Sequence, residues 1–218
     1  DDFLAKPIND LALMARIRSL LRSKILMDEW RSREATALKL SPGFAETSDP
    51  MNVRNCRVLV VVDDPDDSAF IREALKPISA QIVEVKSIAE AEKIVETETF
   101  DLVFSKLDFG TEDGLTICPC LRSNPNTRHI PILLLANPDD LERVAKGFDL
   151  GANDYLLRPF DTHELFARTR TQLRHKRNYD RLRDGLEHNL MLALVDPLTG
   201  AFNRRYLDAN MPRFLQHA

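Results

Sequence analysis

Short hydrophobic runs alternate with amphipathic segments along most of the chain. The run RVLVVV at 57–62 has the length and the continuous apolar character of a strand buried on both faces of a parallel sheet. We expect further strands at 81–85, 102–105, 130–135 and 155–157. The segments between them place apolar residues at helical spacing, and these are 66–75, 88–95, 114–122 and 139–148. Five such units predict an α/β fold with a doubly wound, five-stranded parallel sheet.

Two residues refine the expected helices. Ser87 precedes the helix at 88–95 and is a suitable N-cap, because its hydroxyl can accept a hydrogen bond from the first helical turn. Pro119 lies inside the helix expected at 114–122, where a proline removes a backbone hydrogen bond. We therefore expect a kink in that helix.

A long helix is expected from about Asp161 to Leu194. Apolar residues line one face of it, and arginine and aspartate fill the rest. Gly185 weakens this helix by roughly 1 kcal/mol relative to alanine. The apolar face either packs on the core of its own domain or pairs with a second chain. Because the pattern is longer than one domain is deep, we favour pairing, which predicts a homodimer.

The chain contains an internal repeat at an offset of 152 residues. The segment DFLAKPINDLALMARIRSLLR at 2–22 aligns without a gap to DYLLRPFDTHELFARTRTQLR at 154–174, with nine identities in 21 positions. We therefore expect 1–40 to be the end of a first domain with its helix, followed by a linker at 41–54. A complete second copy is expected at 55–176, a linker helix at 177–195 and the start of another domain at 196–218. On this interpretation the chain is a piece of a longer protein.

Composition excludes several classes of protein. Lysine and arginine number 30 against 34 acidic residues, and a net charge of −4 argues against a general nucleic-acid binder. The longest apolar runs, such as 130–136, are shorter than the ~20 residues of a membrane span. Three cysteines cannot close a disulfide framework, so we expect a reducing, cytoplasmic setting. The spacing of Cys118 and Cys120 does not suit a zinc site, and we expect them in the core.

Candidate chemistry lies where the strands end, because crevices in such sheets form at the carboxyl ends of the strands. Asp63 and Asp64 directly follow the first strand. Two adjacent carboxylates are costly unless a cation lies between them. They are the usual first half of a site for a hard cation with oxygen ligands. The alternative is a solvated acidic loop.

The order VLVVVDDP, FDLVFSK, EDGL, IPILLLAN and GANDYLLRPF, over about 55–176, resembles a response-regulator receiver domain, which has a flavodoxin-like fold. In that family an acidic pair holds Mg²⁺ and an aspartate after the third strand accepts a phosphoryl group. A serine or threonine after the fourth strand and a lysine after the fifth contact the phosphate. By this resemblance Lys106 stands at the acceptor position, Ala136 at the hydroxyl position and Arg158 at the lysine position. Asp108 lies two residues too late to be the acceptor.

These substitutions imply a receiver that is not phosphorylated. A lysine ammonium forms no acyl phosphate, and Ala136 cannot hydrogen-bond a phosphate oxygen. We hypothesise that Lys106 contacts Asp63 and Asp64 in place of the metal, as an ion pair; the alternative is that it points to solvent. The first copy keeps the lysine of the family as Lys6. The missing first receiver is therefore expected to be the functional one, with Lys6 as its phosphate-sensing cation.

The end of the chain carries a second resemblance. The string DPLTGAFNRR at 196–205 is similar to the DxLTGLxNRR signature that opens GGDEF domains, the catalytic domains of diguanylate cyclases, although Ala201 replaces a leucine. The matching residues are Asp196, Leu198, Thr199, Gly200, Asn203, Arg204 and Arg205. On physical grounds alone this is a turn-rich start of a helix. The metal, guanine and phosphate residues of a GGDEF domain lie outside 1–218, so we expect no cyclase activity from this chain.

The order receiver, receiver, GGDEF resembles that of the PleD-type response regulators. The resemblance implies that the intact protein joins two GTP molecules into cyclic di-GMP with Mg²⁺, as a dimer. It also implies a histidine kinase or phosphotransfer protein as partner of the first receiver, with the second receiver as a dimerisation adaptor. Two alternatives stay open, a receiver tandem controlling a DNA-binding output and a stand-alone interaction module.

Overall fold

A computed structural model of the chain describes residues 53–110 and 112–194, together with 13, 14, 17, 21, 24, 28, 199, 201 and 203. The chain divides into two units. The first comprises Asp1–Ile25 and Asp49–Arg177, and the second comprises Leu26–Ser48 and Asn178–Ala218. The first unit contains the whole sheet. Within the described part of the chain, no helix is both long enough and apolar enough to cross a membrane.

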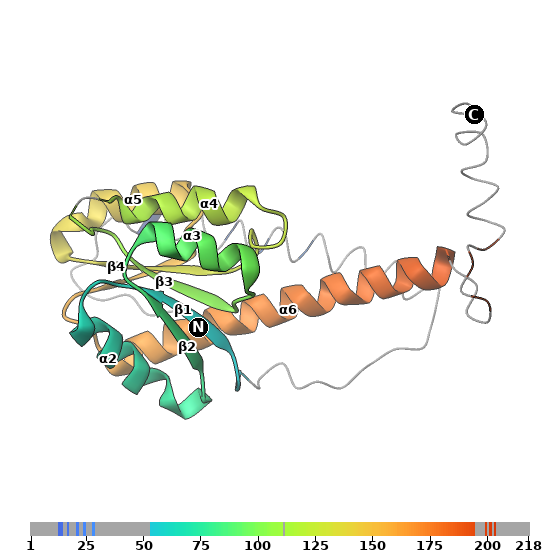
Figure 1. The fold of residues 1–218 in the computed structure, drawn as a ribbon, viewed down its shortest axis with the longest axis horizontal. Helices are drawn as coiled ribbons and strands as arrows, with labels where there is room; N and C mark the ends of the chain where they lie inside the picture. The colour runs from blue at the N-terminus through green and yellow to red at the C-terminus, as the bar shows by residue number, and fades with distance from the viewer. Residues whose placement is uncertain are drawn as a thin grey trace. The chain divides into compact units, whose positions relative to one another are not determined.

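The sheet confirms the predicted fold class. All its strands are parallel, and their order is β2-β1-β3-β4-β5 (Figure 1). The strands are β1 (Arg57–Val61), β2 (Gln81–Val85), β3 (Leu102–Lys106), β4 (Ile132–Ala136) and β5 (Asp154–Leu157). From β1 the chain continues to β2 on one side of the sheet, and from β3 it continues to β4 and β5 on the other side. The ends of β1 and β3 therefore form the switch point at which such sheets place their sites.

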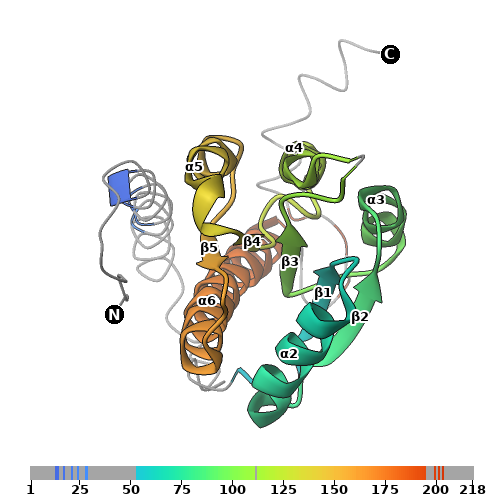
Figure 2. The ribbon, with the colours of Figure 1, turned by 90° about the vertical axis from the view of Figure 1, so that its left-hand side faces the viewer.

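Helices cover both faces of this sheet. The helices α3 (Ile88–Thr97), α4 (Ile117–Ser123) and α5 (Leu141–Asp149) lie on one face. The helix α2 (Pro65–Leu75) and the first turns of α6 (Thr162–Leu194) lie on the other (Figure 2). Three short 3₁₀ turns complete the fold, at Lys76–Ile78 (η1), Gly114–Thr116 (η2) and Pro138–Asp140 (η3).

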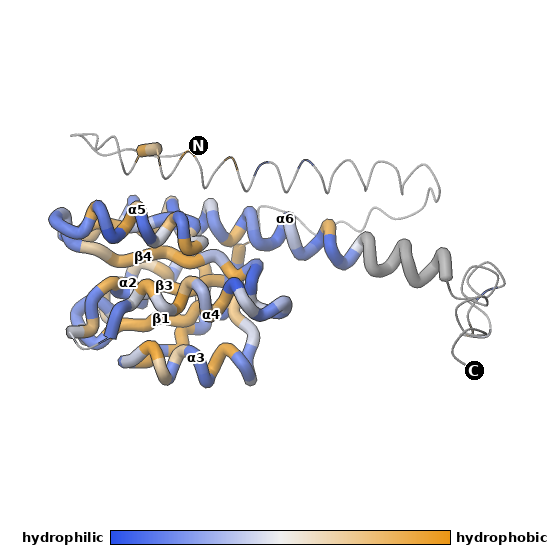
Figure 3. The backbone as a smooth tube through the Cα atoms, turned by 90° about the horizontal axis from the view of Figure 1, so that it is seen from above, coloured by the Kyte–Doolittle hydropathy of each residue, from blue (hydrophilic) through white to orange (hydrophobic). Residues whose placement is uncertain are grey.

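Two apolar layers hold the sheet between the helices. Leu59 and Val61 of β1 pack in the layer under α3, α4 and α5, and Val58 and Val60 pack in the layer under α2 and α6. This alternation follows from the two-residue period of a strand. The resulting strands are hydrophobic over most of their length, and the helices carry both kinds of residue (Figure 3).

The prediction that Cys118 and Cys120 lie in the core is confirmed for Cys118 and wrong for Cys120. Cys56 and Cys118 are completely buried, one in each layer. Burial raises the pKa of each of these thiols to about 11. Both therefore stay protonated near neutral pH and are poor metal ligands. Cys120 is partly exposed.

One expected helix begins later than the sequence suggests. The segment 114–116 forms the 3₁₀ turn η2, and α4 begins only at Ile117. Pro119 therefore lies in the first turn of α4, where its missing N–H has no helical acceptor to lose. The prediction of a kinked helix starting at Gly114 is wrong for this reason.

The start of α6 is fixed by a buried ion pair. Arg168 donates to Asp154 Oδ1 at 2.8 Å, and the two side chains are 4% and 5% exposed. The same arginine also donates to Glu164. Asp154 and Arg168 are two of the positions that the repeat keeps, as Asp2 and Arg16 in the first copy. The repeat therefore preserves a charged pair as well as apolar positions.

Candidate functional site

The end of β3 places a lysine beside the acidic pair. Lys106 Nζ donates to Asp63 Oδ1 at 2.6 Å, and the side chains are 25% and 40% exposed. The ammonium also lies 5.9 Å from the centre of the Phe109 ring. The hydrogen bond from Lys106 lowers the pKa of Asp63, although partial burial opposes this. Asp63 is therefore ionised across the neutral range.

The second carboxylate of the acidic pair has a different partner. Asp64 is the N-cap of α2, and its Oδ1 accepts from the backbone N–H of Asp66 at 2.9 Å. The hypothesis had Lys106 contacting both carboxylates, and the structure shows this contact for Asp63. An N-cap aspartate satisfies one of the free N–H groups of the first helical turn. This competing role, close along the chain, was not weighed in the sequence analysis.

The position at which the receiver family has a hydroxyl is occupied here by a buried alanine. Ala136 ends β4, is 2% exposed, and accepts through its carbonyl from the backbone N–H of Arg158 at 2.9 Å. Asp108, the nearest carboxylate to the acceptor position, instead accepts from the N–H of Gly110 at 2.9 Å. Gly110 has φ +77°, a left-handed conformation that suits glycine. Asp108 is thus part of a turn after β3.

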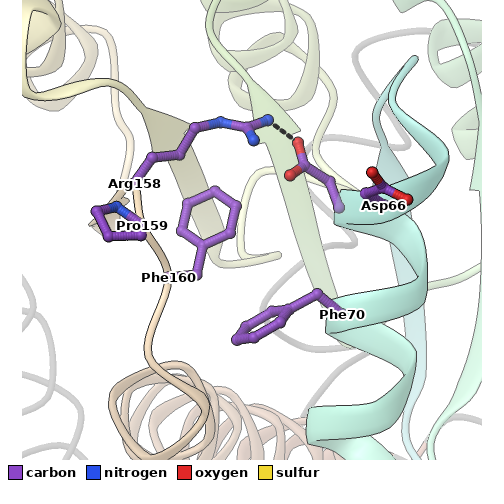
Figure 4. Close-up of a pocket in the computed structure, with 6 residues that line it drawn as sticks. Asp66, Phe70, Arg158, Pro159 and Phe160 are labelled. Atoms are coloured by element: carbon purple, nitrogen blue, oxygen red, sulfur yellow. Dashed lines mark hydrogen bonds and ion pairs between the residues drawn. The ribbon is translucent and has the colours of Figure 1, made fainter.

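Arg158 contacts α2. It forms an ion pair with Asp67, and its guanidinium lies 5.0 Å from the centre of the Phe160 ring. Burial raises the pKa of Asp67, whose side chain is 4% exposed, and the charge of Arg158 opposes that rise. These residues line an open hollow, in which Arg158 and Phe160 face Phe70 (Figure 4). The rings of Phe70 and Phe160 lie 6.0 Å apart.

A further ion pair at this edge was missed by the sequence analysis. Arg143 of α5 donates to Asp113 Oδ1 at 2.8 Å and to the carbonyl of Leu107 at 2.9 Å. Burial opposes ionisation of Asp113, but hydrogen bonds from Leu115 N–H and from Arg143 prevail and lower its pKa. The two charges are 30 positions apart in sequence. No local pattern could have joined them.

The residues at this edge do not fit Mg²⁺. Magnesium needs near-octahedral oxygen ligands and binds proteins through one or two carboxylates. Here the Lys106 ammonium is bound to Asp63, and a divalent ion would have to displace it. Asp64 is turned towards the start of α2. Across the described residues, no group of three His, Cys, Asp or Glu side chains is gathered that could hold a metal.

Several predicted site residues lie outside the part that the structure describes. These are Lys6, Asp196, Leu198, Gly200, Arg204 and Arg205. Thr199 and Asn203 are described, and the hydroxyl oxygen of Thr199 accepts from the backbone N–H of Ala201 at 3.4 Å. This contact is a local turn, in keeping with the turn-rich segment that the sequence predicts there.

The sheet order is that of the flavodoxin-like receiver fold. A model of the response regulator receiver domain family matches residues 58–170, and the chain belongs to this family. A response regulator from Chloroflexus aurantiacus has the same fold, with a TM-score of 0.52 and 29% identity. The match covers 55% of this chain and 98% of that one.

The likeness extends beyond the receiver domain. The chain is 38% identical over 217 residues to the response regulator PleD of Caulobacter vibrioides, covering 100% of this chain and 47% of PleD. It is 31% identical over 136 residues to the DNA-binding dual master transcriptional regulator RpaA of Synechocystis, covering 62% of this chain and 55% of RpaA. The chain thus spans about half the length of these curated relatives.

Proposed function

We propose that this chain is the regulatory part of a response regulator that controls a diguanylate cyclase. In this proposal the second receiver, 55–176, is a dimerisation adaptor that is not itself phosphorylated. The first receiver takes a phosphoryl group from a histidine kinase or phosphotransfer protein. The intact protein then brings two cyclase domains together, and these join two GTP molecules into cyclic di-GMP with Mg²⁺.

The ion pair between Lys106 and Asp63 carries the proposal for the second receiver. The ammonium is 2.6 Å from the carboxylate that would hold the metal, and it stands at the position of the phosphoryl acceptor. Neither neighbouring position supplies what a phosphate would need, because Ala136 has no hydroxyl and Arg158 is bound to Asp67. The site therefore has a fixed positive charge where a receiver has a reversible negative one.

The first copy supports a tandem of receivers. Met14, Ile17 and Leu21 lie on one helical face and are 59%, 40% and 51% exposed. At the repeat offset, Ile17 corresponds to Thr169 and Leu21 to Leu173, and both of these α6 residues are 0% exposed. In the second copy this face thus packs against a sheet. The exposed stripe of the first copy is the face that the sheet of a first receiver would cover.

The cyclase output rests on the string at 196–205 and on the likeness to PleD across the whole chain. The likeness to RpaA favours a DNA-binding output, but it spans 136 residues, about the length of one receiver with its flanks. A receiver alone does not specify an output, because the same fold serves many functions. The match outside the receiver therefore supports the proposal of a cyclase output.

Treatment with a phosphodonor tests the inactive receiver. The chain is incubated with acetyl phosphate and Mg²⁺, and its mass and its melting temperature with and without Mg²⁺ are measured. We expect no phosphoadduct and no rise in melting temperature. In Lys106→Asp, which restores a carboxylate beside Asp63, we expect Mg²⁺ to raise the melting temperature. Lys106→Met is the matched control, because it removes the ammonium without adding a ligand. A phosphoadduct within 55–176 of the unsubstituted chain would contradict the proposal.

Sedimentation of the full-length protein tests the adaptor. A beryllofluoride mimic of the phosphate should raise the proportion of dimer, because it acts on the first receiver. Lys6 and Arg158 are equivalent positions of the repeat and form a matched pair of variants. We expect Lys6→Ala to abolish the response and Arg158→Ala to keep it. A response lost in Arg158→Ala and kept in Lys6→Ala would mean that the second receiver is the switch.

A further inference from the structure

Arg143 joins three segments at the carboxyl edge of the sheet. It projects from the first turn of α5 and donates to the carbonyl of Leu107 at 2.9 Å and to Asp113 Oδ1 at 2.8 Å. It also lies 3.7 Å from Asp140 in the turn that precedes α5. A guanidinium has five donors in a rigid fork and can bind several acceptors at once. One side chain therefore connects the start of α5 to both ends of the loop between β3 and η2.

That loop is held on its other sides as well. At its base, Lys106 is bound to Asp63 at the end of β1. Further along, Glu112 Oε2 accepts from the backbone N–H of Ile88, at the first turn of α3, at 2.8 Å. The loop thus has polar anchors on β1, α3 and α5. These anchors come from three elements that lie on both sides of β3 in the sheet.

Because of these anchors, the segment after β4 can be held in place without a bound phosphate. Ala136 cannot recruit this segment towards the end of β3, since it has no polar side-chain atom. Arg143 makes this connection instead. It lies seven residues after Ala136 in the chain, and its side chain donates to the carbonyl of Leu107. The carbonyl of Leu107 also accepts from Gly114 N–H at 2.9 Å, so the guanidinium binds an oxygen that is already fixed in place.

We propose that Arg143 is a positioning residue that holds the β4–α5 segment and the start of α5 against the β3 loop in one permanent arrangement. The proposal deepens the adaptor role and rests on it: a surface on which another domain docks must keep its shape without a phosphate. The segments that it holds are 137–144 and 107–114. The guanidinium divides its contacts between two nitrogens, because Nη2 donates to both Leu107 and Asp113 while Nη1 lies 3.7 Å from Asp140. A lysine ammonium is a single point charge and could not keep all three contacts.

Amide hydrogen exchange of the 218-residue chain tests this proposal. The variants are Arg143→Gln and Arg143→Lys, and the matched control is Arg72→Gln. Arg72 also forms an ion pair with an acid of another element, Glu84, but it belongs to α2, on the other face of the sheet from α5. We expect exchange in 107–114 and 137–149 to rise about threefold in Arg143→Gln, because local opening becomes easier. We expect a smaller rise in Arg143→Lys and no rise in Arg72→Gln in these segments.

A double-mutant cycle with Asp113→Asn identifies the partner. If Arg143 acts through Asp113, the double variant should exchange no faster than Arg143→Gln alone. Exchange that is equal in Arg143→Gln and Arg72→Gln would overturn the proposal. Should Arg143→Gln fail to fold, Arg143→Lys and Asp113→Asn decide the question by the same measurement. A phosphoadduct on the unsubstituted chain would instead refute the inactive receiver, so the two proposals fail in different experiments.

Discussion

Two ion pairs, one at the amino edge of the sheet and one at the carboxyl edge, differ in their surroundings. Arg168 and Asp154 are 4% and 5% exposed and tie α6 to the start of β5. Lys106 and Asp63 are 25% and 40% exposed and tie the ends of β3 and β1. The distances are 2.8 Å and 2.6 Å, so geometry alone does not distinguish them. Exposure to water does.

The difference in exposure separates a pair that stabilises the fold from a pair that stands where a receiver binds its metal ion. A buried charge that loses its partner keeps its desolvation cost, so the loss is large even where the pair itself adds little. A half-exposed charge that loses its partner is solvated by water, and the cost is small. The pair at the carboxyl edge therefore contributes little to folding. Its effect is to decide which cation occupies the site.

The largest effect is expected from the buried pair. Arg168→Ala removes the cationic partner of the buried Asp154, and we expect a loss of about 3–5 kcal/mol in the free energy of unfolding. Urea unfolding of the chain measures it. Combining Arg168→Met with Asp154→Leu should recover most of the loss, because two apolar side chains then replace two buried charges. A loss below that of the exposed control Arg72→Ala would remove the distinction between the two pairs.

A glycine near the edge pair gives the second effect. A Cβ on Gly114 would lie 1.9 Å from the carbonyl oxygen of Lys106 and 2.9 Å from that of Leu107. Both atoms are backbone, so the chain itself must move, and we expect Gly114→Ala to cost about 1–3 kcal/mol. The shift should also displace Lys106, and amide exchange at 106–108 reports it. Gly185, with no atom within 4 Å of a Cβ, is the control, and Gly185→Ala should stabilise the helix. An equal response at both glycines would contradict this account.

The sequence predicted the fold well because the strands are continuous apolar runs. All five strands and the long α6 are found within two residues of their expected bounds. Because core residues must face inwards, apolar positions recur along the sequence with the periods of strands and helices. The error at 114–116 arose because Pro119 is compatible with two arrangements, a kink inside a helix that begins at Gly114 and the first turn of a helix that begins at Ile117. Only the conformation of the preceding turn distinguishes them.

The site was predictable only as far as motif positions go. The position after the first strand identified Asp63, and the resemblance to receiver domains identified Lys106. Neither could give the partners of Arg158 and Arg143, since Asp67 and Asp113 are 91 and 30 residues away. Long side chains reach several alternative partners, and the fold chooses among them. Asp64 shows the opposite case, in which a local cap takes a residue that the motif assigns to a distant cation.

The smallest effect is expected from the edge pair, and its pH dependence is its signature. Lys106→Met should change the free energy of unfolding at pH 7 by no more than about 1 kcal/mol. The hydrogen bond from Lys106 lowers the pKa of Asp63 in the folded chain. The stability that this adds is complete above the unfolded value of about 3.9 and disappears as pH falls below it.

In Lys106→Met that acid-sensitive part should be absent. Urea unfolding at pH 7 and at pH 3 measures the difference in stability between the two conditions, and this difference should be smaller in the variant than in the unsubstituted chain. Asp67 has a raised pKa, so its contribution runs the other way, present at low pH and lost as pH rises. The charge of Lys106 opposes that rise, so its removal at Asp67 changes the pH difference in the same direction as its removal at Asp63. An unchanged pH difference in Lys106→Met would show that the ammonium does not hold Asp63 in solution, and the cation at this edge would then have to be sought elsewhere.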